Sequence, residues 1–318
     1  MPQWDVFNGD ADGLCALQQL RLAQPRDSRL VTGVKRDIGL LIQVQAQAGD
    51  QVTVLDIALD KNREALVRLL DQGVKVRYFD HHYPGDIPDH PGLDTHIDTR
   101  PDQGTSLLVD HWLGGAHRAW AVVGTFGDNF DRQARAAAVP LGLPEADLER
   151  LRDLGIYLNY NGYGASLDDL HAPPAELAQR MLPFADPLEF IAAEPLFKTL
   201  EAGYRDDMAR AAGLAPVLET ARHRAYVLPD APWARRVSGV LANDLAQAAP
   251  ERAHALLTQL PAGGFLVSVR APMAQPQGAD DLCRRFPSGG GRKAAAGINQ
   301  LPEHQFQAFL AAFQGAFC

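Results

Sequence analysis

VKVRYFDHH, residues 74–82, is an apolar, strand-like run that ends in one carboxylate and two imidazoles. Polar groups beside a buried strand require partners, because burial without a partner is costly. The tripeptide Asp80-His81-His82 therefore indicates a functional site at the end of a strand.

Acidic residues end two earlier strand-like runs in the same way. Asp10 and Asp12 follow residues 4–7 in the sequence NGDADG, and Asp56 follows residues 52–55. The carboxyl ends of parallel strands meet at one edge of an open α/β sheet, where such sheets bind ligands. Carboxylates mixed with imidazoles are typical ligands of divalent metal ions. The pattern predicts a metal-dependent enzyme.

Each of these signals also has a simpler interpretation. Asp10 and Asp12 could stabilise the N-terminus of a helix, where acidic residues are favourable. Asp56 could cap a loop after its strand. The order and spacing of all three signals favour the metal site.

Strand-like and helix-like segments alternate through residues 1–130, which predicts a parallel sheet with helices on both faces. Thr105 or Ser106 is expected to cap the third of these helices. Strands are expected at 4–7, 28–34, 51–57 and 74–79, and helices at 14–23, 62–70, 105–113 and 118–126.

The remaining residues predict a second, smaller α/β domain. Residues 148–180 have a largely helical pattern, interrupted at 159–164, and a helix near 188–212 leads onward. Strand signals return at 224–228 and 265–270, and a helix is expected to open at residues 294–296, after a triple glycine. We expect a catalytic domain, a helical linker and a substrate-binding domain, with the active site in the cleft between the domains. Their predicted bounds are 1–185, 186–222 and 223–318.

Composition is that of an ordinary soluble protein. Of 318 residues, 46% are hydrophobic, and no apolar run approaches the roughly 18 residues that span a membrane. No secretory signal is visible at the N-terminus. Three scattered cysteines, Cys15, Cys283 and Cys318, indicate reduced thiols in a cytoplasmic protein.

Charge is unevenly distributed along the chain. The net charge is −9, but residues from Leu214 onward carry 10 Lys and Arg against 7 Asp and Glu, which gives +3. The preceding residues carry 20 against 32, which gives −12. An acidic body argues against strong duplex DNA binding, which needs many phosphate contacts. A basic C-terminal part suits a short phosphorylated substrate.

The acidic and histidine signals, taken in order, resemble the four motifs of the DHH phosphoesterases. The motifs are NGDADG at residues 8–13, Asp56, Asp80-His81-His82, and Asp128 after an apolar helix. This superfamily includes RecJ-type exonucleases, nano-RNases, cyclic-dinucleotide phosphodiesterases, family II pyrophosphatases and exopolyphosphatases. The C-terminal part is similar to the DHH-associated domain, whose mark is a glycine-rich turn, here GGGRK at residues 289–293.

The resemblance implies a centre of two Mn²⁺ ions. Asp10 would bind the first ion, Asp56 would bridge the two, and three residues would bind the second: Asp12, His81 and Asp128. Two ions about 3.5–4 Å apart can stabilise both the attacking and the leaving oxygen of an in-line displacement.

The other two residues of the tripeptide would act on the substrate. His82 would face the scissile phosphate and, when protonated, could donate to its oxygens. Asp80 would not contact a metal ion but would orient a histidine by a hydrogen bond.

Three positions depart from the family pattern. Relatives often have a metal-binding His where this chain has Val6, and Asp where it has Asn8. Asn8 still offers a carbonyl oxygen, and we group it with the substrate-binding residues, but a neutral ligand weakens the first metal site. Arg292 replaces a common His and could clamp a phosphate bidentately.

The glycine-rich turn is the expected anion-binding element of the second domain. Gly289, Gly290 and Gly291 would let backbone N–H groups approach a phosphate, and the following helix would add its dipole. The alternative is a flexible surface turn. Lys293 adds a second cation beside Arg292, and Arg270 could reach the same pocket.

The segment at residues 159–164 has two readings that the sequence leaves open. Tyr160, Asn161 and Tyr163 could contact a base, since aromatic faces stack on bases. Equally, these residues could simply end a helix.

We expect a Mn²⁺-dependent phosphoesterase that hydrolyses phosphodiester or terminal phosphate bonds. Its substrates would be short oligonucleotides, dinucleotides or related nucleotides, and no membrane partner is expected. One alternative is an exopolyphosphatase or pyrophosphatase. The other is a non-catalytic nucleotide-binding module that has lost its first metal.

Overall fold

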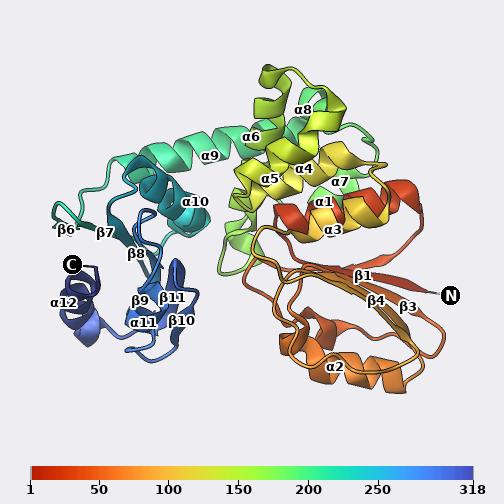
Figure 1. The fold of residues 1–318 in the computed structure, drawn as a ribbon, viewed down its shortest axis with the longest axis horizontal. Helices are drawn as coiled ribbons and strands as arrows, with labels where there is room; N and C mark the ends of the chain where they lie inside the picture. The colour runs from red at the N-terminus through yellow and green to blue at the C-terminus, as the bar shows by residue number, and fades with distance from the viewer. Residues whose placement is uncertain (1, 318) are drawn as a thin grey trace. The chain divides into compact units, whose positions relative to one another are not determined.

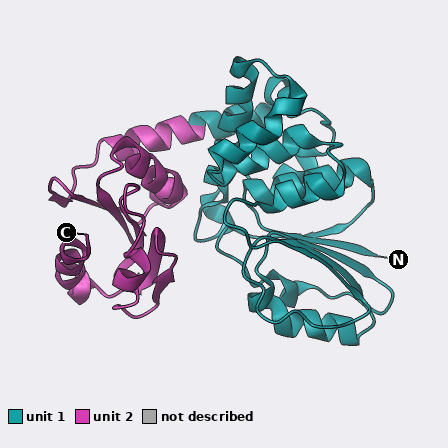
Figure 2. Cartoon of the chain, in the orientation of Figure 1, with its two compact units in different colours: residues 1–202 teal, residues 203–318 magenta. Residues whose placement is uncertain are grey.

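The computed structural model describes residues 2–317 and divides into two compact units, residues 1–202 and 203–318 (Figure 2). Cys15 and Cys283 are buried free thiols, whereas Cys318 lies outside the described residues. Within residues 2–317, no helix combines the length and hydropathy needed to cross a bilayer.

Unit 1 contains a five-stranded sheet in which every neighbouring pair is parallel, in the order β2-β1-β3-β4-β5 (Figure 1). The strands are β1 (Gln3–Phe7), β2 (Arg29–Val31), β3 (Gln51–Leu55), β4 (Lys75–Asp80) and β5 (Leu93–Ile97). The predicted parallel sheet is confirmed. The edge strand β5 was not predicted, because its sequence LDTHI is half-exposed and carries no apolar run.

Helices cover both faces of this sheet (Figure 1). One face packs against α2 (Leu59–Asp71) and the 3₁₀ turn η1 (Leu40–Gln43), with Val6, Val54 and Val76 in the shared core. Because successive strand residues point to opposite faces, the buried side chains of Phe7, Leu55 and Phe79 line the other face. That face lies under α1 (Ala11–Ala23) and α3 (Thr105–Trp112).

Further helices complete unit 1 around α4, which packs against both α1 and α6. They are α4 (Arg118–Gly127), α5 (Asp131–Ala138), η2 (Val139–Leu141), α6 (Glu145–Gly162), η3 (Leu167–Asp169), α7 (Pro174–Met181) and α8 (Pro187–Ala193). Helix α9 (Pro195–Ala212) runs from unit 1 into unit 2. The single helix predicted near 188–212 is thus two helices, because Pro195 can begin a helix but cannot continue one.

Unit 2 contains a six-stranded mixed sheet in the order β10-β11-β9-β8-β7-β6. Among these described strands, only β7 and β8 pair in parallel. The strands are β6 (Leu218–Glu219), β7 (His223–Leu228), β8 (Ala253–Gln259), β9 (Phe265–Arg270), β10 (Gly289–Gly291) and β11 (Ala295–Leu301). The helices are α10 (Pro232–Ala248), α11 (Ala279–Cys283), η4 (Glu303–Gln305) and α12 (Phe306–Ala316). The expected second α/β domain is present.

The helix predicted to open at residues 294–296 is wrong, because these residues enter strand β11. The triple glycine is itself strand β10. A Cβ on Gly289 would lie 1.8 Å from the carbonyl oxygen of Cys283, and one on Gly291 would lie 2.5 Å from Cα of Ala296. The glycines thus allow close backbone packing, and a strand, not a helix dipole, follows them.

Gly9 has a similar packing role between β1 and α1. A Cβ there would lie 2.0 Å from the carbonyl oxygen of Gly33 and 2.5 Å from Cγ of Pro174. The missing side chain therefore lets the segment after β2 approach the NGDADG loop.

Gly9→Ala should destabilise the chain by about 1–3 kcal/mol, because the new methyl group forces the neighbouring backbone apart. The free energy of unfolding in urea measures this change. Gly39→Ala is the matched control, since a Cβ at Gly39 meets no heavy atom of the described residues within 4 Å. Equal effects of the two substitutions would contradict the packing role of Gly9.

Candidate metal centre

Asp10 caps helix α1 and also contacts a cation. Its Oδ1 accepts a hydrogen bond from the backbone N–H of Gly13 at 3.1 Å. Its Oδ2 lies 2.5 Å from Nζ of Lys35. The simpler interpretation of this aspartate as a helix cap is therefore correct, but it accounts for only one of the two oxygens.

Asp12 is buried in the first turn of α1 and caps a different helix. Its Oδ2 and Oδ1 accept hydrogen bonds from the backbone N–H groups of Thr105 and Ser106, at 2.6 and 2.8 Å. The prediction that Thr105 or Ser106 caps α3 is wrong: Gly104 occupies the cap position, and the acceptor is this distant carboxylate. A Cβ on Gly104 would lie 3.2 Å from both carboxylate oxygens.

Asp56 follows β3 in the left-handed backbone region, at φ +60°, which is unusual for a residue other than glycine. Its Oδ1 accepts a hydrogen bond from Thr105 Oγ1 at 3.1 Å and lies 3.4 Å from His81 Nε2. Burial, followed by the charges of Asp10 and Asp12, raises the pKa of Asp56 well above its usual value.

Asp80, His81 and His82 continue from β4 toward the same carboxylates. The buried Asp80 accepts a hydrogen bond at Oδ1 from the backbone N–H of His81 at 2.9 Å, and this oxygen lies 2.8 Å from His82 Nδ1. The His82 side chain is 33% exposed. Asp80 therefore makes the contact that the predicted orienting role requires.

Asp128 ends helix α4 and completes a ligand set. Its Oδ2 lies 3.8 Å from His81 Nε2. One ligand atom each from Asp12, His81 and Asp128 lies within 4.8 Å of the others, and Asp56, His81 and His82 form a second such group. The structure thus brings together the three residues predicted to bind the second ion.

The charges of this cluster suit a divalent cation. Burial, followed by the charge of Asp128, raises the pKa of Asp12 to about 6. Burial opposes the charge of His81, but contact with Asp56 and then the charge of Asp12 raise the pKa of His81 to about 10. Carboxylates and an imidazole that converge in this way fit Mn²⁺ or a similar ion.

Lys35 is the site residue that the sequence analysis missed. Its Nζ contacts Asp10 Oδ2 at 2.5 Å, Asn159 Oδ1 at 2.8 Å and Asp128 Oδ1 at 3.3 Å. Burial opposes the charge of Lys35, but Asp10 holds its pKa well above the usual range. One signal was available: Lys35 directly follows residues 28–34, which were predicted as a strand and so should end at the same edge of the sheet.

Asn8 contacts the backbone of this lysine. Its Nδ2 donates a hydrogen bond to the backbone carbonyl of Lys35 at 3.3 Å, and its buried Oδ1 has no hydrogen-bond partner within residues 2–317. The predicted substrate-binding role of Asn8 stays a prediction. The contact that is present supports the backbone of Lys35.

The base-stacking hypothesis is wrong for Tyr160 and Asn161, because both side chains are fully buried in α6. The Tyr160 hydroxyl lies 2.8 Å from His171 Nε2, and Asn161 bonds the backbone of Ala172. Helix α6 continues to Gly162, past the start of the predicted interruption.

The candidate substrate-binding residues of unit 2 lie along β9, β10 and the turn into β11. Arg270 pairs in register with Ala295, and its Nε donates to Asn243 Oδ1 at 3.0 Å. Arg292 and Lys293 are exposed on the turn, just past Gly289, Gly290 and Gly291 in β10. Their role in binding an anion stays a prediction.

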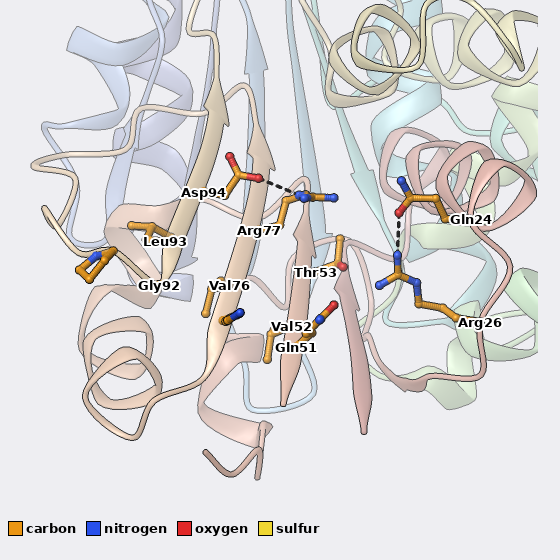
Figure 3. Close-up of a pocket in the computed structure, with 12 residues that line it drawn as sticks. Gln24, Arg26, Gln51, Val52, Thr53, Val76, Arg77, Gly92, Leu93 and Asp94 are labelled. Carbon is orange, nitrogen blue, oxygen red and sulfur yellow. Dashed lines mark hydrogen bonds and ion pairs between the residues drawn. The ribbon is translucent and has the colours of Figure 1, made fainter. Parts of the chain in front are cut away.

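A pocket of about 460 Å³ lies at the opposite edge of the unit 1 sheet, at the amino ends of β3 and β4 (Figure 3). Arg77, which pairs with Asp94, and Arg26, which bonds Gln24, lie in this pocket. Its lining contains none of the predicted site residues, which in unit 1 gather at the carboxyl ends of the strands, as expected for an open parallel sheet.

No family model and no curated protein sequence matches this chain. Solved structures match it over 99% of its length. An exonuclease RecJ bound to manganese has a TM-score of 0.65 at 21% identity, with 89% of that chain covered. The DHH domain of a protein from a family of ribosomal proteins has a TM-score of 0.68 at 16% identity, with 86% covered. A pGpG-specific phosphodiesterase from Vibrio cholerae has a TM-score of 0.57 at 13% identity, with 100% covered. The predicted DHH fold is confirmed.

Adding Mn²⁺ to metal-free protein should raise its melting temperature. A ligand that binds only the folded state at 100 times its Kd adds about 2.7 kcal/mol of stability. Protons compete with the ion for His81, whose pKa is raised to about 10, so the increase should be smaller at pH 6 than at pH 8. Thermal unfolding with Mn²⁺ and with a chelator measures the effect. An unchanged melting temperature at saturating Mn²⁺ would contradict the metal centre.

Proposed function

We propose that this chain, which has the DHH fold, is a metal-dependent phosphoesterase. Its substrates would be short oligonucleotides, dinucleotides or related nucleotides, cleaved at phosphodiester or terminal phosphate bonds. The observation that carries this proposal is the convergence of Asp12, His81 and Asp128 at the carboxyl edge of a parallel sheet.

A divalent ion held by these three residues would act as a Lewis acid on a phosphate oxygen and would lower the pKa of water. Mn²⁺ is the ion we propose, because the ligands combine carboxylates with imidazole and because a RecJ of this fold binds manganese.

His82 is the residue we propose to act directly on the phosphate. It is partly exposed beside the metal ligands, and Asp80 holds its Nδ1 at 2.8 Å. A protonated imidazole held by one nitrogen can donate its other N–H to a phosphoryl oxygen or to the leaving group. Asp80 would keep the ring in this orientation.

The turn between β10 and β11 is the proposed binding element for the anionic end of the substrate. Arg292 and Lys293 are exposed there, in the part of the chain with a net charge of +3 from Leu214 onward. A guanidinium can bind two phosphate oxygens at once. The neighbouring glycines place no side chains in the way.

The activity can be tested on a panel of phosphate compounds, each with Mn²⁺ and with a chelator. The panel contains a dinucleotide, a short RNA, a short DNA, a nucleoside 3′,5′-bisphosphate, a cyclic dinucleotide, polyphosphate and pyrophosphate. We expect cleavage of the dinucleotide or short oligonucleotides with Mn²⁺ only. Cleavage confined to polyphosphate or pyrophosphate would instead identify a phosphoanhydride hydrolase. Nucleotide binding without any cleavage would identify a non-catalytic module.

Substitutions of the two adjacent histidines should have different effects. His81→Ala should weaken Mn²⁺ binding, because it removes a ligand. His82→Ala should retain Mn²⁺ binding but lower kcat by about 10²–10⁴-fold, the usual contribution of a general acid or base. Calorimetric titration with Mn²⁺ and steady-state kinetics separate the two effects.

His111→Ala is the control, since His111 is an exposed histidine on α3. It should change neither property. Equal loss of Mn²⁺ binding in His81→Ala and His82→Ala would make His82 a ligand and remove its proposed role.

A further inference from the structure

The ammonium of Lys35 is surrounded by oxygens as a bound cation would be. Asp10 Oδ2, Asn159 Oδ1 and Asp128 Oδ1 lie 2.5, 2.8 and 3.3 Å from its Nζ. An ammonium has three N–H donors, so these three acceptors match its capacity. The side chain is 22% exposed, which keeps the charge within reach of solvent and of a substrate.

The backbone around Lys35 is built to hold this position. Its N–H donates to the carbonyl of Gly162 at 2.8 Å, and its carbonyl accepts from Asn8 Nδ2 at 3.3 Å. A carboxylate at position 8 could not donate the second of these bonds. The segment reaches the NGDADG loop because Gly9 has no Cβ to meet the carbonyl of Gly33.

Asp10, the residue that the family pattern assigns to a first metal ion, already holds a cation. Its Oδ1 accepts from the N–H of Gly13, and its Oδ2 contacts Lys35. Val6, where relatives often carry a histidine, is fully buried in the core with Val54, and its side chain has no donor atom to offer a metal.

Asp128 lies between Lys35 and another proposed metal ligand, His81. Its Oδ1 faces Lys35 at 3.3 Å, whereas its Oδ2 faces His81 Nε2 at 3.8 Å. The carboxylate can therefore serve Lys35 with one oxygen and a metal ion with the other.

We propose that Lys35 takes the place of the first metal ion, so that the chain binds one divalent ion, at Asp12, His81 and Asp128, beside a permanent ammonium charge. This inference rests on the metal centre of the proposed function and replaces the two ions that the family resemblance implies with one. Lys35 would then offer the substrate phosphate a positive charge that a chelator cannot remove.

The test is the number of Mn²⁺ ions bound per chain, measured without substrate. Metal-free protein is titrated with Mn²⁺ by calorimetry, and bound Mn²⁺ is observed by electron paramagnetic resonance. We expect one ion per chain and no magnetic coupling between ions. Two ions per chain with a coupled signal would overturn the proposal.

Variants at Lys35 show whether the ammonium excludes the second ion. Lys35→Ala should gain a second Mn²⁺ and a coupled signal, because the three oxygens lose their cation. Lys35→Arg keeps the positive charge and should remain at one ion, as should Lys61→Ala, an exposed control on α2. One ion in Lys35→Ala, with a cooperative thermal unfolding transition showing that it is folded, would also overturn the proposal. If Lys35→Ala does not fold, Lys35→Met replaces it in the same titration.

The result is independent of the activity panel. One ion per chain with no cleavage of any compound would leave the one-ion centre standing and remove the phosphoesterase. Two ions per chain with nucleotide cleavage would overturn the one-ion centre and leave the phosphoesterase standing. No bound Mn²⁺ at all would overturn the metal centre itself.

Discussion

Burial of several carboxylates at one edge of a sheet is the constraint around which unit 1 is organised. Asp10, Asp12 and Asp56 are each at most 2% exposed, and a buried charge without a partner is very costly. Each finds a different partner: an ammonium for Asp10, the N-terminus of α3 for Asp12, and a hydroxyl with an imidazole for Asp56. The elements that supply these partners come from distant parts of the chain, so the site and the packing of the unit depend on each other.

Local pattern was sufficient for four of the five parallel strands and for the acidic and histidine residues that follow them, because both depend on short stretches of sequence. It failed where a partner lay far along the chain. Lys35 sits 93 residues from Asp128, and Asp12 the same distance from the helix it caps. Alanines 294–296 favour a helix locally, but pairing between β11 and β9 overrides that preference.

Two of the three departures from the resembled motifs, Val6 and Asn8, form a consistent set once Lys35 is included. Taken singly, Val6 removes a metal ligand of the family pattern, and Asn8 replaces a charged ligand with a neutral one. In the structure, Val6 belongs to the core, and the amide of Asn8 supports the backbone of Lys35. The ion pair between Lys35 and Asp10 is largely shielded from water. Electrostatic interactions are stronger in such a shielded position than at the surface. Val6 and Asn8, which look like losses in the metal-binding motif, are thus compatible with an ammonium, in place of a metal ion, as the positive charge beside Asp10.

Asp12 carries a consequence for how relatives of this chain should be compared. Its two oxygens hold the first N–H groups of α3, so a relative without the proposed activity would still need an acceptor there to keep that helix in place. Selection for folding alone would then preserve this aspartate. Its presence in a relative therefore says little about catalysis. The contacts described for His81 and Asp128 hold no helix terminus, so only the proposed metal site would keep these two residues unchanged. Active and inactive lineages are better distinguished at those two positions.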